Sequence, residues 1–521
     1  MPKVDARLAC IAYTSCNQQA PTRPCALKSL FLVCGICSGK LKLLPHPMPC
    51  AGNFARLFEV IDPTNHQGSI VNTTASKPGL FDPLGKIERF GLITLLIGVF
   101  AFGCVTEVRS AFLKRRMTDV DTYFRAAWAV RVHKDPYNVT DTNGWHYNYP
   151  PLLATLLYPL ADAPSKFSRA GLLPYPVSVA IWFLISIGCI WLGSHVLAQA
   201  LEKTSTDPAV RNMPRYCRRW WALRIIPILV CLPAIGRAVV RGQVNSELLM
   251  LFCFAGAALA TRKRFWSGFA NGLAAALKVF PGFLILYGLS RLRWRYLVGM
   301  AVALAVGLFV IPGIIMGPHH MIAGYHRFAQ VVLEPAFGLN HNTSRDKELL
   351  DINKTDSTSF EAMIDHTVYI GRHAPAPAKW MKLAHWGISA TLVAITLLVE
   401  YLRRKDDPIF RNLFLGVLIT IMMPIIPICH PHYFCMVLPL VTALLAARWE
   451  RDRTLPLGGA LGWVLIFFAA SHIMTVLPPP FYILRGLGLV TYSALALWGA
   501  GLFVMWHWKT PQELHESPAL A

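Results

Sequence analysis

Apolar runs separated by short polar links follow one another through most of this 521-residue chain. The first run, at about 90–108, is long enough as an α-helix to cross the hydrocarbon core of a bilayer. Later runs predict further spans at about 175–198, 223–240, 246–260, 266–277, 280–289, 296–316, 380–401, 413–428, 434–447, 457–476 and 483–506. The pattern therefore predicts an all-α polytopic membrane protein with about twelve transmembrane helices.

Two neighbouring runs, 266–277 and 280–289, are too short to cross a bilayer straight. Between them, Pro281 lacks an amide donor and biases Phe280 away from helical backbone. We therefore expect a hairpin of half-length helices that is broken at Lys278. A broken helix at membrane depth is tolerated where it lines protein or a water-filled cavity.

Short basic links predict the orientation of the chain, because Lys and Arg collect in the cytoplasmic loops of membrane proteins. Threading the runs in and out places five such links on one side: 203–219, 262–264, 291–295, 403–411 and 448–453. The basic cluster 114–116 falls on the other side. That side, predicted to be extracytoplasmic, also receives the loop with Asp119, the turns at 242–245, 278 and 430–433, and the long segment 317–378.

Composition supports a membrane protein and argues against a nucleic-acid-binding one. The chain is 54% hydrophobic and 15% charged, whereas soluble domains are nearer a quarter charged. Its formal net charge of +22 comes from clusters between apolar runs, where anionic membrane lipid is the expected partner. No nucleic-acid partner is expected.

Three segments follow from these patterns. Residues 1–85 lack sustained periodicity and are predicted to form a poorly ordered, cytoplasmic N-terminal extension. Residues 86–510 are predicted to form the transmembrane domain, and residues 511–521 a cytoplasmic tail. In the extension, Cys34 and Cys37 have metal-ligand spacing, but a zinc finger needs a second pair at the right distance. Six of the 13 cysteines fall in the first 50 residues and most of the others lie in apolar runs, so no disulfide framework is implied.

The loop after the first run begins with Asp119 and Asp121. On an extended segment the two carboxylates would share one side, whereas on a helix they would lie about 200° apart. One can act as a general base while the other orients a cation or caps a helix beginning near Thr122. Alternatively, both are only caps or surface charges.

Lys278 is the one charge in an otherwise apolar hairpin. A buried ammonium needs a partner, which would be a carboxylate or a ligand phosphate; reaching out to the membrane surface is the alternative. Arg241 offers a second cation on the same side. His430 and His432 form an H-x-H pair without a visible third ligand, which favours hydrogen bonding to phosphate or sugar over a metal.

The motifs taken together resemble a known family. They are Asp119-x-Asp121-x-Tyr123-Phe124-Arg125, Asp135-Pro136-Tyr137, Tyr149-Pro150-Pro151, Gly242-Gln243-x-Asn245, Lys278-x-x-Pro281 and His432-Tyr433. In this order, over about 88–506, they resemble glycosyltransferase family 87 of the GT-C superfamily. That family includes polyprenol-phosphate-mannose-dependent mannosyltransferases and related arabinofuranosyltransferases.

The resemblance implies a GT-C bundle that transfers a sugar, expected to be mannose, from a polyprenyl-phosphate donor to a lipid or glycan hydroxyl with inversion. It implies no cofactor, no metal, and a site on the extracytoplasmic face of the cell (plasma or inner) membrane. The implied catalytic residues are Asp119, as the base, and Asp121. The implied substrate-binding residues are Tyr123, Arg125, Tyr149, Arg241, Gln243, Asn245, Lys278, His430, His432 and Tyr433.

Two other functions use the same features differently. A transporter or flippase of lipid-linked sugars would need a similar charged cavity without turnover, although such proteins often carry internal repeats and none is seen here. A binding or scaffold protein is the third interpretation.

Overall fold

The structure is a computed structural model. It describes residues 79–107, 118–141, 143–164, 172–336, 356–369, 378–452, 459–475 and 486–509, together with residues 339, 345, 348, 349, 351, 477, 481 and 484. Several predictions lie outside these residues: the extension 1–85 apart from 79–85, the Cys34 and Cys37 pair, the basic cluster 114–116 and the tail 511–521.

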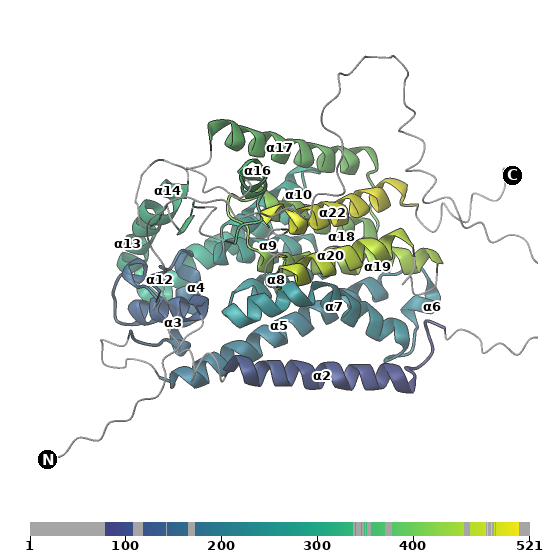
Figure 1. The fold of residues 1–521 in the computed structure, drawn as a ribbon, viewed down its shortest axis with the longest axis horizontal. Helices are drawn as coiled ribbons and strands as arrows, with labels where there is room; N and C mark the ends of the chain where they lie inside the picture. Colours follow the sequence, from purple (N-terminus) through teal and green to yellow (C-terminus); the bar gives the residue numbers. More distant parts are fainter. Residues whose placement is uncertain are drawn as a thin grey trace, which may run out of the picture. The chain divides into compact units, whose positions relative to one another are not determined.

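The described chain is helical (Figure 1), and its β-structure is limited to isolated bridges. The main helices are α2 (Lys86–Glu107), α3 (Thr118–Arg131), α4 (Pro151–Leu156), α5 (Tyr175–Lys203), α7 (Arg218–Arg241), α8 (Asn245–Ala260), α9 (Arg264–Leu277), α10 (Ile285–Leu289), α11 (Trp294–Ala305), α12 (Ile311–Met316), α13 (Pro318–Phe328), α16 (Phe360–Val368), α17 (Lys379–Leu402), α18 (Pro408–Ile425), α19 (Leu438–Asp452), α20 (Ala460–Met474) and α22 (Leu489–His507). Short 3-10 helices, η4 (Phe280–Leu284) and η7 (Pro431–Val437), precede α10 and α19.

Each predicted apolar run overlaps a helix, but the helices differ in length. In the described part of the chain, eight are long and apolar enough to cross a membrane: Lys86–Thr106, Tyr175–Lys203, Arg218–Arg241, Trp294–Met316, Lys379–Leu402, Pro408–Ile425, Pro431–Glu450 and Leu489–His507. Asn245–Ala260, Phe280–Leu289 and Ala460–Met474 are apolar but shorter. The prediction of an all-α multi-span membrane protein is therefore confirmed, whereas the number twelve is not established.

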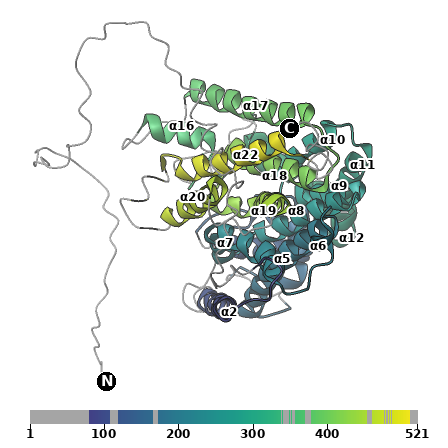
Figure 2. The same cartoon turned by 90° about the vertical axis from the view of Figure 1, so that its right-hand side faces the viewer.

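Burial separates central from peripheral helices. In α18 and in the span Pro431–Glu450, 89% of the apolar window is buried, against 11% for α2 and 22% for α17. Figures 1 and 2 show α2 and α17 at the outside of the helix bundle. Exposed apolar side chains on these two helices, such as Phe90, Leu96, Leu383 and Trp386, are those that bilayer lipid would cover.

Close packing of small residues fixes α9 against α11. A Cβ added at Gly268 would lie 1.9 Å from the Tyr296 carbonyl oxygen, and one added at Gly272 would lie 2.5 Å from the Met300 carbonyl oxygen. Such small-xxx-small spacing lets two membrane helices approach closely. This contact holds α9, and therefore Lys278 just beyond its end, in a fixed position.

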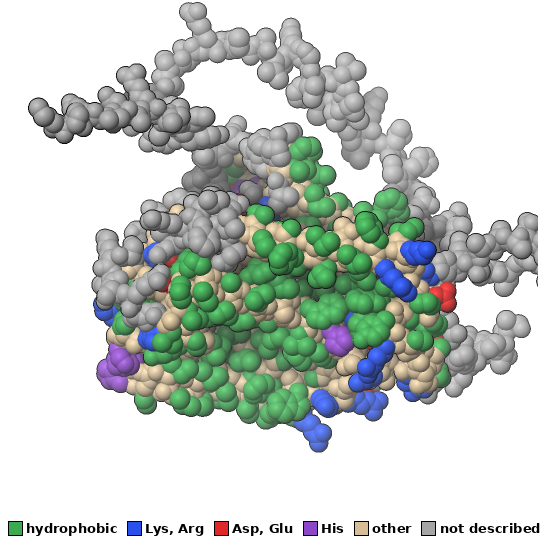
Figure 3. All heavy atoms as spheres, turned by 90° about the horizontal axis from the view of Figure 1, so that it is seen from below, with side chains coloured by type: hydrophobic (Ala, Val, Ile, Leu, Met, Phe, Trp, Pro, Cys, Tyr) green, Lys and Arg blue, Asp and Glu red, His purple; other side chains and the backbone are tan. Residues whose placement is uncertain are grey.

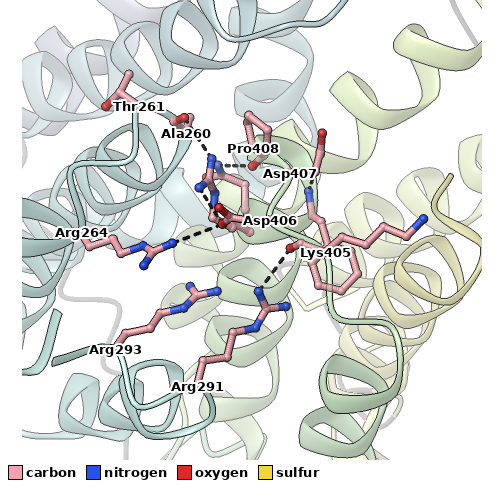
Figure 4. Close-up of polar contacts among 12 residues, drawn as sticks. Ala260, Thr261, Arg264, Arg291, Arg293, Lys405, Asp406, Asp407 and Pro408 are labelled. Carbon is pink, nitrogen blue, oxygen red and sulfur yellow. Dashed lines mark hydrogen bonds and ion pairs between the residues drawn. The ribbon is translucent and has the colours of Figure 1, made fainter. Parts of the chain in front are cut away.

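The predicted basic links gather at one end of the bundle. Asp406 in the α17–α18 link pairs with Arg264 at 3.4 Å and with Arg411 at 3.0 Å, and Arg291 donates to the Lys405 carbonyl, as Figure 4 shows. Ser205 and Arg219 likewise contact Glu450, and these contacts join the link 203–219 to the link 448–453. On the face drawn in Figure 3, Lys and Arg side chains gather towards one end of an apolar surface.

Candidate active site

Asp119 lies in the first turn of α3, and α3 is not among the candidate spans. Its carboxyl is half-buried close to Arg241, Gln243 and Lys278. Burial raises the pKa of Asp119 above its ordinary value, while Arg241, a hydrogen bond with Gln243, and Lys278 oppose the rise. A carboxylate whose proton affinity is raised by burial is suited to accepting a proton.

Asp121 faces a different set of groups. Because α3 begins at Thr118 and not near Thr122, the expectation that one aspartate caps a later helix is wrong. Both carboxylates lie on the helix, about 200° apart. Asp121 is fully buried, and its Oδ2 lies 3.2 Å from Nη2 of Arg125, which also donates to the Thr140 carbonyl. Of the alternatives, Asp121 is thus the carboxylate that orients a cation, and this pair ties α3 to the following loop.

The turn between α7 and α8 places two amide side chains at the site. Gly242 ends α7 with φ 64°, a left-handed conformation that glycine adopts without steric cost. The Gly242 carbonyl accepts a 2.9 Å hydrogen bond from Nε1 of Trp182. The turn is therefore anchored to α5, and it presents the buried side chains of Gln243 and Asn245.

Two tyrosines predicted at the site meet Gln243. The Tyr123 hydroxyl donates to the Tyr149 hydroxyl at 2.8 Å, and the Tyr149 hydroxyl donates to Oε1 of Gln243 at 3.2 Å. The two rings pack edge to face at 5.0 Å between centroids. Because the amide oxygen of Gln243 accepts the bond from Tyr149, its NH₂ group is left to donate to Asp119.

Lys278 is buried, so it does not extend to the membrane surface as the alternative interpretation required. It follows the last residue of α9, where the backbone turns extended (φ −151°, ψ 121°), so the predicted break is confirmed. Nζ of Lys278 donates to Oδ1 of Asn245 at 3.2 Å and lies 3.9 Å from the centroid of the Tyr433 ring. Nearby Asp119 supplies the negative charge. The ammonium therefore has partial compensation that an anionic ligand would complete.

The His430–Tyr433 turn closes the other side of the site. His430 and His432 stack at 5.1 Å between ring centroids, and the Asn245 amide approaches the His432 carbonyl at 3.5 Å. Among the described residues, Nε2 of His432 and Nδ1 of His430 are buried without a hydrogen-bond partner. Buried polar atoms are normally paired, so these two nitrogens are candidates for contact with a ligand.

Arg241 lies at the rim of the site. Its Nη2 is 3.6 Å from Oδ2 of Asp356, and the two side chains are 40% and 35% exposed. Sequence analysis missed Asp356, because nothing in the local pattern distinguishes it from other polar residues of the long segment. The five polar constellations predicted to share one side of the membrane thus converge on a single site.

A second polar cluster, also missed, joins Arg345 and Glu348 to the loop before α4. Glu348 accepts hydrogen bonds from Nδ1 of His146 at 2.6 Å and from Nδ2 of Asn148 at 2.8 Å. Arg345 donates to Oδ1 of Asn148 at 2.6 Å and to the Tyr137 carbonyl. These partners are about 200 residues apart, and no local spacing could have indicated them.

The Glu348 contacts predict a pH-dependent contribution to stability. Burial alone would raise the pKa of Glu348, but hydrogen bonds from His146 and Asn148 hold it below its ordinary value. A lowered folded-state pKa gives stability that is present at neutral pH and lost as pH falls through it. Glu348→Gln should therefore cost about 1–2 kcal/mol at neutral pH and approach wild type on acidification, measured as thermal unfolding against pH. An equal deficit at every pH would contradict this.

The residues that the structure describes contain no group of three or more His, Cys, Asp or Glu side chains placed to hold a metal ion. Lys278 and Arg241 contribute positive charge at the site.

Apolar helices of membrane-spanning length surround a carboxylate that faces a buried lysine and an arginine at the rim. These features define an integral membrane protein with a candidate active site between its helices. The sequence profile of glycosyltransferase family 87 matches residues 147–427, more than half of the chain. The chain belongs to glycosyltransferase family 87 and is a membrane glycosyltransferase. The family assignment gives no support to the transporter or scaffold interpretations.

No curated protein matched the chain. Among solved structures, the crystal structure of ArnT from Cupriavidus metallidurans bound to undecaprenyl phosphate is similar to this one, with 14% sequence identity and a TM-score of 0.36. The match covers 80% of this chain and 77% of the ArnT chain.

Proposed function

We propose that this glycosyltransferase takes its sugar, mannose, from a polyprenyl-phosphate donor and transfers it to a hydroxyl of a lipid or glycan acceptor. The observation that carries the proposal is the convergence of Asp119, Lys278 and Arg241 on one site. An acidic group and two cations are the charges needed at the two ends of a displacement at a sugar carbon. The proposed class of donor is the one expected for the family, and the motifs from Asp119 to Tyr433 resemble those of the family in their order.

The proposed reaction is a single displacement with inversion. The acceptor oxygen attacks the anomeric carbon as the bond from that carbon to the phosphate oxygen breaks. Asp119 takes the proton of the acceptor hydroxyl. The polyprenyl phosphate leaves with the bonding electron pair, and Lys278 and Arg241 stabilise its negative charge. His432, with an unpartnered Nε2, is a donor to a phosphate oxygen or a sugar hydroxyl when protonated at that atom.

The remaining predicted residues position these groups. Gln243, fixed by Tyr149, orients the Asp119 carboxyl, and Asn245 holds the Lys278 ammonium. Tyr433 stacks on Phe280 at 5.6 Å between ring centroids and places its ring against the same ammonium. The described contacts of Arg125 are with protein groups, so we assign it to positioning and not to direct contact with substrate.

We also propose that the site faces the extracytoplasmic side of the cell membrane, within a GT-C bundle. The supporting observation is the gathering of the basic links at the end away from Asp119, since short basic loops favour the cytoplasmic side. Labelling of single cysteines introduced near Asp356 and near Asp406, in intact cells with an impermeant reagent, would distinguish the two ends.

A donor screen tests the proposed function. Purified protein in lipid is given polyprenyl-phosphate-mannose, polyprenyl-phosphate-arabinofuranose or GDP-mannose with candidate lipid and glycan acceptors, and products are detected by mass spectrometry. We expect a product one hexose heavier from polyprenyl-phosphate-mannose alone. Transfer from GDP-mannose and not from either lipid-linked donor would refute the donor class, and transfer of arabinofuranose alone would refute mannose.

A further inference from the structure

A cavity of about 500 Å³ lies between α5, α8 and α9, and none of the residues assigned to the candidate active site lines it. Its inner wall is apolar and includes Leu251, Phe254 and Leu273. The cationic side chains of Lys203 and Lys263 line one end, together with Trp266. The cavity thus joins an apolar space to a pair of positive charges.

The two lysines are available to an anion. Lys203 is the last residue of α5, Lys263 lies in the α8–α9 turn, and both are exposed. Among the described residues neither ammonium forms an ion pair. The nearest acidic neighbour in sequence, Glu202, is already engaged by Arg224 through bonds of 2.7 and 2.8 Å. An anionic group at this end would meet positive charge with no carboxylate of the cavity lining competing for it.

The position of Trp266 sets the depth of the charged end. Its side chain is 58% exposed, three residues after Lys263 and at the start of α9. Trp and Lys together at the end of apolar helices are characteristic of the headgroup level of a membrane. The apolar wall, further along α8 and α9, then lies at the level of the acyl chains.

The charged end of the cavity is remote from the candidate active site. Asn245, which binds Lys278, begins α8, whereas Thr261, directly after the end of α8, lines the cavity. A helix of 16 residues separates the two positions by about 24 Å. The charged end of the cavity and the candidate active site are therefore at opposite ends of α8, while the apolar wall extends along α8 as far as Leu251.

We propose that this cavity binds a glycerophospholipid with an anionic headgroup. One acyl chain occupies the apolar space between α5, α8 and α9, and the headgroup phosphate pairs with Lys203 and Lys263. The argument for this occupant is charge complementarity at headgroup depth next to an apolar space. The binding site is independent of which sugar donor the enzyme uses.

Native mass spectrometry of the full-length protein tests the proposal by titration with phosphatidylglycerol or phosphatidylcholine of the same acyl chains. We expect wild type to favour phosphatidylglycerol. Each basic side chain near a membrane surface raises affinity for an anionic lipid about fivefold. The double variant Lys203→Gln with Lys263→Gln should therefore bind phosphatidylglycerol about 25- to 30-fold more weakly than wild type. The matched control, Lys379→Gln with Lys382→Gln on α17, makes the same charge change at exposed positions and should keep the preference.

A second variant tests the acyl-chain space without altering charge. Ala258 is half-buried and lines the cavity, so Ala258→Trp should weaken binding of both lipids while the protein keeps its elution volume and melting temperature. Equal phosphatidylglycerol binding by wild type and the Lys203 and Lys263 double variant would overturn the proposal. An equal loss of the preference for phosphatidylglycerol in the α17 control would also overturn it. The same holds if polyprenyl phosphate binds more tightly than phosphatidylglycerol and Ala258→Trp abolishes that binding. If Ala258→Trp does not fold, the lysine variants decide the question.

Discussion

Replacing Asp119 with Asn is expected to lower kcat for sugar transfer by about 100- to 10,000-fold, the usual contribution of a general base. Asn has nearly the same shape, so α3 and the contact with Gln243 should persist, but its amide cannot accept the acceptor proton. The measurement is product formation by purified protein with polyprenyl-phosphate-mannose and the acceptor found in the donor screen. Transfer by the variant at the wild-type rate would refute the assignment of the base.

The pH profile gives an independent readout of the same assignment. Burial raises the pKa of Asp119, and a base acts only when it is deprotonated. Wild-type activity should therefore fall as pH is lowered through this raised pKa, which gives the pH profile an acidic limb. This acidic limb should be absent from the residual activity of Asp119→Asn. The matched control is Asp121→Asn in the same turn of α3. It should lower the melting temperature, because Arg125 is left buried without its carboxylate, and it should keep the acidic limb.

Replacing Lys278 with Met is expected to lower kcat/KM for the lipid-linked donor by about 100- to 1,000-fold, as loss of one preorganised charge-stabilising group does in other enzymes. Met fits the buried, aromatic-lined space next to Tyr433 without a charge. The effect should appear mainly in the steps that use the donor, because the ammonium is proposed to meet the leaving phosphate. The measurement is the dependence of the initial rate on donor concentration.

The control for Lys278 is Lys382→Met, which removes an exposed lysine on α17. It should leave donor use unchanged. If Lys278→Met kept the wild-type kcat/KM, Lys278 would have no role in binding or stabilising the phosphate. An equal loss in the α17 variant would show that the effect comes from overall charge and not from the site.

The sequence predicted the helices and the residues of the site better than their partners. The break after α9 was predicted correctly, but its expected cause was not: Phe280 lies in the 3-10 helix η4, and the extended residue is Lys278. The short runs on either side were also predicted, but helix length alone does not establish how many of the runs cross a membrane. The start of α3 was missed because Asp119 and Asp121 are favoured at helix ends and within first turns alike.

The partners of the site residues could not be predicted from spacing. Asp356 meets Arg241, and Glu348 meets His146, across more than 100 residues of sequence. Such contacts depend on how the helices pack, and packing is set by many small contacts such as that between Gly268 and Tyr296. The motifs nevertheless predicted that Asp119, Gln243 and Lys278 belong to one site, and the structure places these residues close together.

The central claim is that Asp119 and Lys278 act at the two ends of one displacement, Asp119 on the acceptor hydroxyl and Lys278 on the lipid phosphate. Binding of polyprenyl phosphate, the proposed leaving group, to wild type, Asp119→Asn and Lys278→Met tests it without an acceptor. We predict tighter binding by Asp119→Asn, because a nearby negative charge is removed, and weaker binding by Lys278→Met. Affinities that are the same for all three proteins would contradict the account.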